Sequence, residues 1–315
     1  MTTHTSTAKR DLLSLVDLST EEIHYLFART THLKAAHKAG EIVHSLRGRT
    51  LAMVFEKPST RTRVSFETGM YQLGGHALFL SSKEMQLGRG EEISDSARVL
   101  SRYVDGIMVR TFAHENLVTM AHYATVPVIN GLSDDYHPCQ ILTDIFTFQE
   151  HRGSIAGRKV AWIGDGNNVA HSWILAAARL GFHLVLAVPE GYEPKAAIVA
   201  RAEQEIAQHG TSGSITLVRQ PQEAVIAADL VTTDAWTSMG QEQEVKKRQQ
   251  AFAGYCVDTL LLQHAKPEAL FMHCLPAHRG EEVTSEVLDG PQSVVWDEAE
   301  NRLHVQKAIL EWLLA

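Results

Sequence analysis

The chain has 315 residues, of which 44% are hydrophobic, and it carries a formal net charge of −8. This length is typical of about two domains, and the apolar fraction is enough for two buried cores. The negative charge argues against a nucleic-acid surface, and we expect Lys246-Lys247-Arg248 to be a solvated helix face. No segment approaches the ~20 consecutive apolar residues of a membrane span, and we expect no signal peptide in residues 1–10, which lack an apolar core.

The predicted elements alternate between strand and helix along the chain. Ser19 and Glu22 form a capping box before a long helix that should stop near Gly40. Another long helix, through Leu142 and Phe146, should end near His151-Arg152-Gly153, where we expect a hinge. The predicted strands are 50–55, 76–80, 106–109 and 127–129 before this hinge, and 159–163, 183–188, 215–218, 230–233 and 270–272 after it. The alternation predicts an α/β protein with two doubly wound parallel-sheet domains.

The stretch Ser59-Thr60-Arg61-Thr62-Arg63 lies where the first strand gives way to a helical pattern that opens near Thr62. Hydroxyl groups, guanidinium groups and the positive end of a helix dipole meet here, which is typical of a phosphate site. No P-loop motif precedes it, so side chains and the helix start would hold the anion. Taken alone, capping hydroxyls and solvated arginines explain the stretch equally well.

Two further groups follow predicted strands in the first half. Arg110 ends the strand 106–109, and His137-Pro138-Cys139-Gln140 opens a helix after the strand 127–129. His and Gln can both donate hydrogen bonds to a carbonyl or phosphoryl oxygen, and Pro138 suits the first turn of a helix. Because ligands gather at the carboxyl ends of parallel strands, these groups favour one anion site together with the first motif.

The glycine turn Gly164-Asp165-Gly166-Asn167-Asn168-Val169 follows a predicted strand and opens a helix. It differs from a dinucleotide fingerprint because the third glycine position is Val169 and no acidic residue stands at the end of the next strand, where Pro189-Glu190 is a weak substitute. We therefore expect a tight turn and no NAD site.

The cysteines are three, Cys139, Cys256 and Cys274, without CxxC or Cys/His metal spacing. They indicate a reducing compartment without a disulfide framework, and we expect a cytoplasmic protein. The 17 histidines are scattered without zinc spacing, so we expect no metal site.

Five motifs stand in order along the chain: Phe55 to Arg63, Met108-Val109-Arg110-Thr111-Phe112, His137-Pro138-Cys139-Gln140, Asp234-Ala235-Trp236-Thr237-Ser238-Met239-Gly240 and His273-Cys274-Leu275-Pro276. Together they resemble the motifs of the aspartate/ornithine carbamoyltransferase family. The first three resemble carbamoyltransferases in general, and the last two are similar to the ornithine branch of the family.

The resemblance implies transfer of a carbamoyl group from carbamoyl phosphate to the δ-amine of ornithine, giving citrulline and phosphate, without metal or cofactor. It assigns the phosphate to the helix start and to a residue from a neighbouring subunit, and it assigns the carbonyl oxygen to an arginine and a histidine, with Gln140 holding the carbamoyl NH2. The implied residues are Ser59, Thr60, Arg61, Thr62 and Gln86 for the phosphate, and Arg110, His137 and, with them, Thr62 for the carbonyl oxygen.

The resemblance also implies the acceptor site. Asp234 and Ser238 would bind the α-amino group of ornithine, and Asn168 with the Met239 backbone would hold its carboxylate, beside Leu275. An amine with a pKa of about 10.4 must lose a proton before it attacks. Like-charge repulsion from the arginines favours the free amine, Cys274 resembles the residue that helps take the proton, and Arg302 would close the site from the start of the last helix.

For the domains, the resemblance implies a carbamoyl phosphate domain at 1–150 and an ornithine domain at 151–297, with a final helix at about 298–315 docking back on the first. Its apolar pattern is Leu303, Val305, Ile309, Leu310 and Leu313. A homotrimer is implied, with the loop 81–90 carrying Gln86 into the adjacent active site.

Two alternatives stay open. Putrescine or aspartate carbamoyltransferase would share the first-domain motifs, although Ser238-Met239-Gly240 argues against both. An anion-binding regulatory protein could keep the fold without turnover, although five intact residues argue against it: Arg61, Arg110, His137, Cys274 and Arg302. The direction, arginine biosynthesis or degradation, is open as well.

Overall fold

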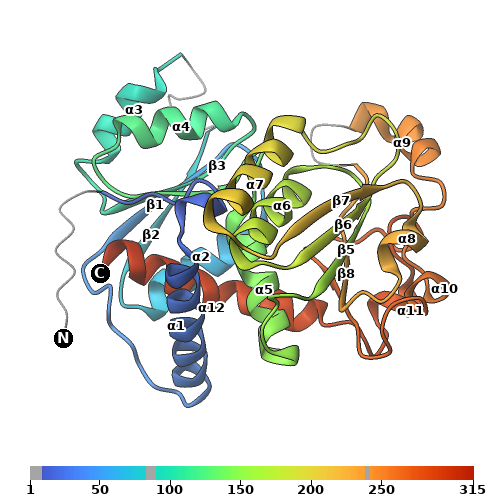
Figure 1. The fold of residues 1–315 in the computed structure, drawn as a ribbon. Helices are drawn as coiled ribbons and strands as arrows, with labels where there is room; N and C mark the ends of the chain where they lie inside the picture. Colours follow the sequence, from blue (N-terminus) through green and yellow to red (C-terminus); the bar gives the residue numbers. More distant parts are fainter. Residues whose placement is uncertain (1–8, 83–89, 238–241) are drawn as a thin grey trace. The chain divides into compact units, whose positions relative to one another are not determined.

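The computed structural model describes residues 9–82, 90–237 and 242–315. The chain forms two compact units, one of Met1–Cys139 with Leu303–Ala315 and one of Gln140–Arg302. Each unit has a parallel sheet covered by helices, which confirms the predicted α/β class (Figure 1). Every strand predicted from the sequence is present, and each starts within one residue of its predicted start.

The sheet of the first unit has the order β2-β1-β3-β4, with every neighbouring pair parallel. β1 is apolar and buried from Leu51 to Phe55, as is typical of an inner strand of a parallel sheet, whereas β2 lies at the edge and is partly exposed. β4 begins at Val128 and not at the predicted Pro127, since proline has no N–H to donate to a sheet. The strands are β1 (Thr50–Phe55), β2 (His76–Ser81), β3 (Gly106–Arg110) and β4 (Val128–Leu132).

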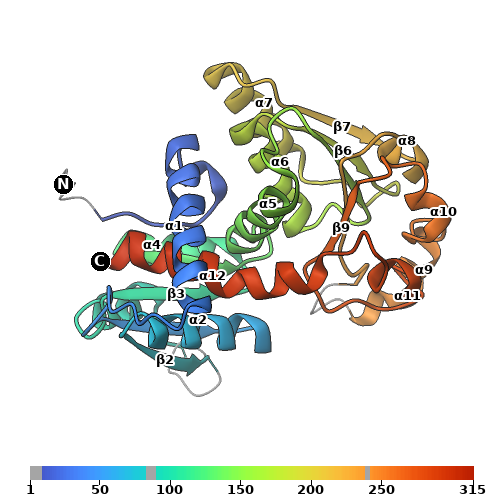
Figure 2. The ribbon, with the colours of Figure 1, turned by 90° about the horizontal axis from the view of Figure 1, so that it is seen from below.

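Helices cover both faces of this first sheet (Figures 1 and 2). α3 and α4 pack on the face that presents Ala52 and Val54. On the other face, Leu314 of the last helix, α12 (Val295–Leu314), lies against Gly106, and Leu310 lies against α2 at Gly69. The predicted docking of the C-terminal helix on the first unit is thus confirmed. The elements are η1 (Leu15–Asp17), α1 (Thr20–Lys38), α2 (Thr60–Gln72), α3 (Ile93–Leu100) and α4 (His114–Tyr123).

The capping box at the start of α1 is present as predicted. The Ser19 hydroxyl accepts from the Glu22 N–H at 3.2 Å, and the Glu22 carboxylate accepts from the Ser19 N–H at 2.9 Å. The helix ends at Lys38, just before Gly40.

The sheet of the second unit has the order β7-β6-β5-β8-β9 and is also fully parallel. Figure 2 shows α5 and α6 on one side of it and α8, α10 and α11 on the other. The strands are β5 (Lys159–Ile163), β6 (His183–Ala187), β7 (Ser214–Val218), β8 (Leu230–Thr233) and β9 (Leu270–His273). The shorter helices are α6 (Asn168–Leu180), α7 (Ala196–His209), α8 (Pro221–Val225), η3 (Glu242–Glu244), α9 (Val245–Ala251), α10 (Thr259–Leu262) and α11 (Ser285–Leu288).

Two long helices carry the chain from one unit to the other. α5 (Pro138–Arg152) ends as predicted, at Gly153, whose φ of 74° only glycine adopts readily. α12 (Val295–Leu314) begins three residues earlier than predicted. Arg302 therefore lies inside the last helix, and the expectation that it lies at the helix start was wrong.

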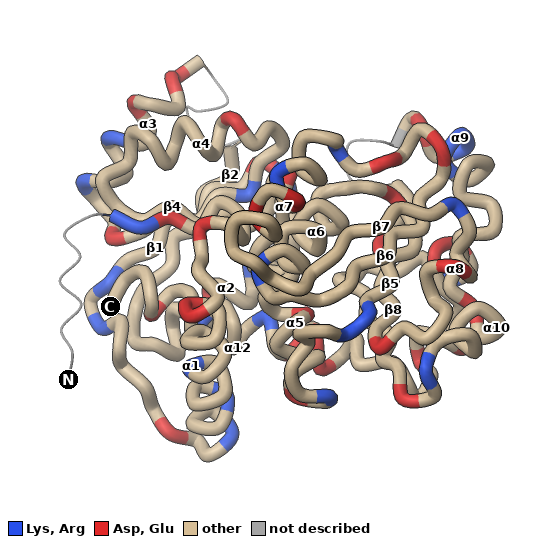
Figure 3. The backbone as a smooth tube through the Cα atoms, viewed as in Figure 1, with Lys and Arg blue, Asp and Glu red and all other residues tan. Residues whose placement is uncertain are grey.

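Charged residues are spread over both units (Figure 3). The expectation of a solvated helix face at Lys246-Lys247-Arg248 holds for the two lysines, which are exposed. It was wrong for Arg248, which is only 6% exposed and pairs with Asp165. In the described part of the chain, no helix combines the length and apolar character needed to cross a membrane.

Candidate active site

Three motifs of the first unit follow neighbouring strands of one sheet. Phe55 at the end of β1 pairs with Arg110 of β3, and Arg110 pairs in turn with Leu132 at the end of β4. Parallel strands have their carboxyl ends at one edge of the sheet. The start of α2, Arg110 and the segment that leads to His137 therefore all begin at that edge.

The start of α2 is built by Ser59. Its hydroxyl accepts from the Thr62 N–H at 3.2 Å and also donates to the Thr62 hydroxyl at 3.1 Å. The helix begins at Thr60, two residues before the predicted opening, because Ser59 is the N-cap. Thr62 is buried, Arg61 is half-buried and Thr60 is exposed. This arrangement gives a helix N-terminus with hydroxyl and guanidinium donors, which is suited to an anion.

Two charged residues after β1 join the strand ends. The Glu56 carboxylate accepts from the Thr111 hydroxyl and from the Phe112 N–H, the latter at 3.2 Å. Lys57 is 5% exposed, pairs with Asp134 and lies 4.3 Å from the centre of the Phe112 ring. The sequence analysis gave neither residue a role. Their position directly after a buried strand is the signal that could have found them.

Arg110 and His137 are buried, at 5% and 4% exposure. Burial removes the water that would screen the guanidinium of Arg110, so its attraction to a nearby negative group is strengthened. Both side chains are donors, so this part of the first unit can stabilise negative charge on an oxygen.

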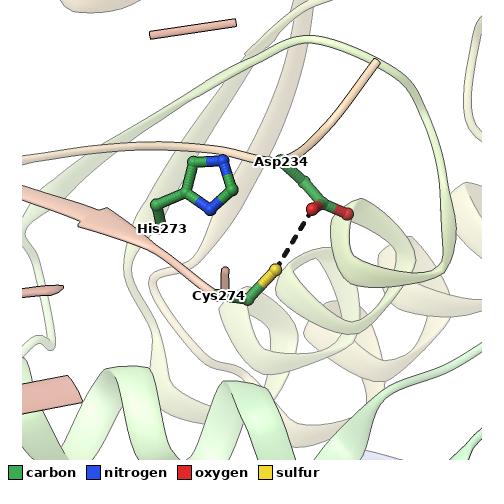
Figure 4. Close-up of side chains that lie close together, drawn as sticks. All are labelled: Asp234, His273 and Cys274. Carbon is green, nitrogen blue, oxygen red and sulfur yellow. Dashed lines mark hydrogen bonds between the residues drawn. The ribbon is translucent and has the colours of Figure 1, made fainter. Parts of the chain in front are cut away.

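The second unit brings together side chains that follow β5, β8 and β9. Asp234, directly after β8, accepts from the Asn167 side-chain amide at 2.8 Å and from the Cys274 thiol at 3.1 Å (Figure 4). The same carboxylate also accepts from the Ala235 N–H at 2.8 Å. Asp234 therefore does more than cap a loop, because it links the ends of three adjacent strands.

Asn167, which the sequence analysis did not single out, is the residue that contacts Asp234. Its side-chain oxygen caps α6 by accepting from Val169 N–H at 3.0 Å and Ala170 N–H at 3.1 Å, and this leaves its amide nitrogen to donate to Asp234. The predicted Asn168 is the next residue and begins the helix. The capping preference of Asn at a strand-to-helix turn is the signal that could have identified Asn167.

Cys274 is a neutral thiol in this arrangement. Its surroundings raise the pKa well above the usual range, first through burial and then through the nearby carboxyl groups of Asp234 and Glu298. The thiol consequently donates to Asp234, and it is not a thiolate base at neutral pH.

His273 and Glu282 form a fully buried pair next to Cys274. The His273 Nδ1 accepts from the Leu275 N–H at 2.9 Å, so a neutral ring carries its proton on Nε2, 3.2 Å from Glu282. Burial alone would raise the pKa of Glu282, but hydrogen bonds from His273 and from the His278 N–H outweigh it and lower the pKa. Leu275 itself has a φ of 59°, a left-handed conformation that is strained for a branched side chain.

Gln140 and Arg302, both predicted site residues, meet in the second unit. Arg302 donates to the Gln140 side-chain oxygen, and the Gln140 amide nitrogen donates to Asp144 and Glu298. Sequence reasoning missed the two acidic residues. Each lies four positions from a predicted site residue on the same helix, and this spacing could have found them.

Three predicted site residues lie outside the described part of the chain. They are Gln86, Ser238 and Met239.

Two groups of acidic, histidine and cysteine side chains have the spacing of metal ligands. Asp234, His273 and Cys274 offer ligand atoms within 4.8 Å of one another, as do His278, Glu281 and Glu282. In the first group both His273 nitrogens already face partners, Leu275 N–H and Glu282. In the second group Glu282 is the partner of that same histidine, so neither group presents a complete donor set.

The glycine turn after β5 is tight, as predicted. A side chain at Gly166 would collide with the backbone of the segment Tyr192 to Pro194, so a residue without Cβ is needed there. Asp165 in this turn is held by Arg248 at 2.7 Å. The turn is thus used for packing.

Comparison with known proteins places this fold and these motifs in one class. Residues 10–150 match the carbamoyl-P binding domain of aspartate/ornithine carbamoyltransferase, and residues 156–313 match its Asp/Orn binding domain. The chain belongs to the aspartate/ornithine carbamoyltransferase family.

The particular relatives are ornithine carbamoyltransferases. The chain is 58% identical over 305 residues to the one from Halorhodospira halophila, a match that covers 97% of this chain and 99% of the relative. It is 56% identical over 306 residues to the one from Hydrogenovibrio crunogenus, covering 97% and 98%. The solved ornithine carbamoyltransferase from Pyrococcus furiosus is similar with a TM-score of 0.93 and 54% identity, covering 98% of this chain and 97% of that one.

Proposed function

We propose that the chain is an ornithine carbamoyltransferase, which transfers the carbamoyl group of carbamoyl phosphate to the δ-amine of L-ornithine and yields L-citrulline and phosphate. The observation that carries the proposal is the contact of Asp234 with both Asn167 and Cys274. The motifs of the first unit suit any carbamoyltransferase, whereas Asp234 and Cys274 belong to the two motifs that resemble the ornithine branch.

The first substrate is bound by donors. Ser59, Thr60, Arg61 and Thr62 hold the phosphate at the start of α2, with Gln86 added from a neighbouring subunit. The buried donors Arg110 and His137 meet the carbonyl oxygen, which becomes negative when the amine attacks. In such preorganised sites each lost donor typically costs about 10²–10³ in rate.

The bonds that form and break in the proposed reaction balance without a cofactor. The amine nitrogen forms a bond to the carbonyl carbon, the bond from that carbon to the phosphate oxygen breaks, and the nitrogen loses a proton. Because the Cys274 thiol is neutral and donates to Asp234, it can take this proton while it passes its own to the Asp234 carboxylate.

The second substrate is recognised through its α-substituents. Asp234 and Ser238 bind the α-amino group, while Asn168 and the Met239 N–H hold the α-carboxylate beside Leu275. The position of Asn168 in the first turn of α6 supports this assignment, because a helix N-terminus favours a carboxylate. Gln140 holds the carbamoyl NH2, and Arg302 supports it.

We extend the proposal to the organisation of the protein. Residues 1–150, with the last helix, bind carbamoyl phosphate, and residues 151–297 bind ornithine. The enzyme is a cytoplasmic homotrimer that serves arginine biosynthesis, and Gln86 completes the site of the adjacent subunit.

The test is citrulline formation with ornithine, putrescine and aspartate as acceptors. Ornithine should greatly outperform putrescine, because putrescine leaves Asn168, Met239 N–H and Asp234 without their partners. Equal efficiency with ornithine and putrescine would rule out this recognition scheme. A chain that binds carbamoyl phosphate but forms no carbamoylated product with any of the three acceptors would instead be an anion-binding regulator.

A further inference from the structure

Four polar side chains form a buried cluster within the second unit. Gln140 and Asp144 lie one turn apart on α5, and Glu298 and Arg302 lie one turn apart on α12. Each is at most 4% exposed. Since water does not reach them, their hydrogen-bonding groups have to be satisfied by other groups of the protein.

The orientation of the Gln140 amide follows from its neighbours. Its nitrogen donates to Asp144 Oδ1 at 2.7 Å and to Glu298 Oε1 at 2.9 Å, and its oxygen accepts from Arg302. A flipped amide would set its NH2 against the guanidinium, where two donors would meet, and its oxygen against two acidic groups. Only the observed orientation fits.

The cluster has two carboxyl groups for a single guanidinium. With both carboxyl groups ionised it would carry an uncompensated buried negative charge, which is costly. Burial raises the pKa of Asp144 to about 7 and raises that of Glu298 well above its usual range, and the two groups interact with each other. At neutral pH the two carboxyl groups therefore hold one proton between them, and Arg302 balances the remaining charge.

Glu298 also contacts the backbone at the end of β9. Its second oxygen, Oε2, accepts from the His273 N–H at 2.9 Å, and His273 is followed by Cys274. One carboxyl group thus contacts both the Gln140 amide and the end of β9. Both of its oxygens are used as acceptors, by different partners.

We propose that Asp144 and Glu298 are a positioning pair, which holds one proton in common and fixes the Gln140 amide so that its oxygen is presented to the carbamoyl NH2. This inference rests on the proposed function, in which Gln140 binds that NH2. Neither carboxyl group touches the reacting atoms, so both act through Gln140.

The two carboxyl-to-amide substitutions make a matched pair of variants. In Asp144→Asn, the new amide oxygen can accept from Gln140 and the new NH2 can replace the shared proton, while ionised Glu298 balances Arg302. In Glu298→Gln, the single amide oxygen cannot serve both Gln140 and the His273 N–H. Because the backbone of β9 is fixed, the new NH2 then faces the NH2 of Gln140 and displaces it. Net charge and volume change equally in both variants.

The experiment compares carbamoyl phosphate with acetyl phosphate, in which a methyl group replaces the NH2. The readout is the ratio of the inhibition constant of acetyl phosphate to the KM of carbamoyl phosphate, which does not depend on the fraction of folded enzyme. Wild type should prefer carbamoyl phosphate. Glu298→Gln should lower the ratio by about three- to tenfold, the usual worth of one hydrogen bond, and Asp144→Asn should stay within about twofold of wild type. Gln140→Met marks the floor of the ratio.

The outcomes separate the two proposals. An unchanged ratio in Glu298→Gln, or an equal fall in both variants, overturns the positioning pair and leaves the transferase function standing. A wild-type protein that forms no citrulline, or does not distinguish the two phosphates, overturns the assignment of Gln140 and the pair with it. If Glu298→Gln does not fold by circular dichroism, Asp144→Leu replaces it. That variant removes the other acceptor of the Gln140 amide while Glu298 still balances Arg302, so its ratio should fall as well, and an unchanged ratio overturns the pair.

Discussion

Arg248 gives the sharpest stability prediction, because it is a buried cation that joins three segments of the second unit. Its guanidinium donates to Asp165 Oδ2 at 2.7 Å and to the Trp236 carbonyl at 2.7 Å, and it lies 4.9 Å from the centre of the Tyr192 ring. Replacing it by methionine keeps most of the volume and leaves the Asp165 carboxylate buried without its partner. Removing one partner of such a pair typically costs about 3–5 kcal/mol, so Arg248→Met should lose that much unfolding free energy at pH 8.

The loss should depend on pH. Burial already raises the pKa of Asp165, and Arg248 is the group that opposes the rise. Without Arg248 the native pKa rises further, so the native state binds a proton more tightly than the unfolded chain does. The contribution of this carboxyl group to stability is then greatest at low pH, and it falls as pH rises from the unfolded pKa through the raised native value. The deficit of Arg248→Met relative to wild type should therefore be smaller at pH 5 than at pH 8.

Urea unfolding followed by tryptophan fluorescence measures this, because most tryptophans lie in the second unit: Trp162, Trp173, Trp236 and Trp296. Asp165→Asn combined with Arg248→Met should recover much of the loss, since it removes the orphaned charge, and the exposed neighbour Lys247→Met should change little. A wild-type midpoint for Arg248→Met at pH 8, or an equal deficit at both pH values, would refute the reasoning.

Three further predictions concern turnover. Arg61→Ala should stay folded and lose at least about 10²-fold in turnover at saturating carbamoyl phosphate, and near-normal turnover would end the phosphate assignment. Activity should rise through mildly alkaline pH as ornithine loses its proton, and Cys274→Ala should lower turnover more than carbamoyl phosphate binding; unchanged turnover with an unchanged pH profile would make Cys274 a packing residue. Refolding Arg61→Ala together with Gln86→Ala should rebuild some wild-type sites, because an Arg61→Ala subunit can supply an intact Gln86 to a neighbour whose Arg61 is intact. Mass spectrometry verifies that mixed trimers have formed. If their activity never exceeds the average of the two parent variants, Gln86 does not act across subunits.

Much of the fold could be predicted because parallel sheets leave a clear signal in the sequence. Buried strands such as β1 are short apolar runs, and the polar residues that end or follow such strands, such as Arg110 and Asp234, identify one edge of each sheet. Once the alternation with helices fixes the strands of a sheet as parallel, the residues at their carboxyl ends must lie along the same edge of that sheet. This inference needs no knowledge of side-chain packing. For this reason the motifs at the strand ends could be predicted from the sequence.

The burial of charged residues inside helices could not be predicted in this way. Arg248 is a residue type that normally faces water, and its sequence neighbours do not distinguish it from a solvated charge. For Asp144 and Glu298, the only local signal is their spacing of four residues from Gln140 and Arg302. Gln140 and Glu298 are 158 positions apart in the chain, and Arg248 and Asp165 are 83 apart. Their burial is decided by partners that only the folded chain provides, so the sequence alone favoured a solvated face for Arg248.

The two helix starts show how the same kind of N-cap can create two different chemical environments. Ser59 caps α2 and Asn167 caps α6, each directly after a strand of its own sheet. The side-chain oxygen of each cap accepts hydrogen bonds from N–H groups in the first turn of its helix. This keeps the helix start ordered, while the rest of the first turn remains positive. In α2 the neighbouring side chains are hydroxyl and guanidinium donors, which suit a dianionic phosphate. In α6 the cap also donates to the Asp234 carboxylate, so a negative side chain lies beside the positive end of that helix.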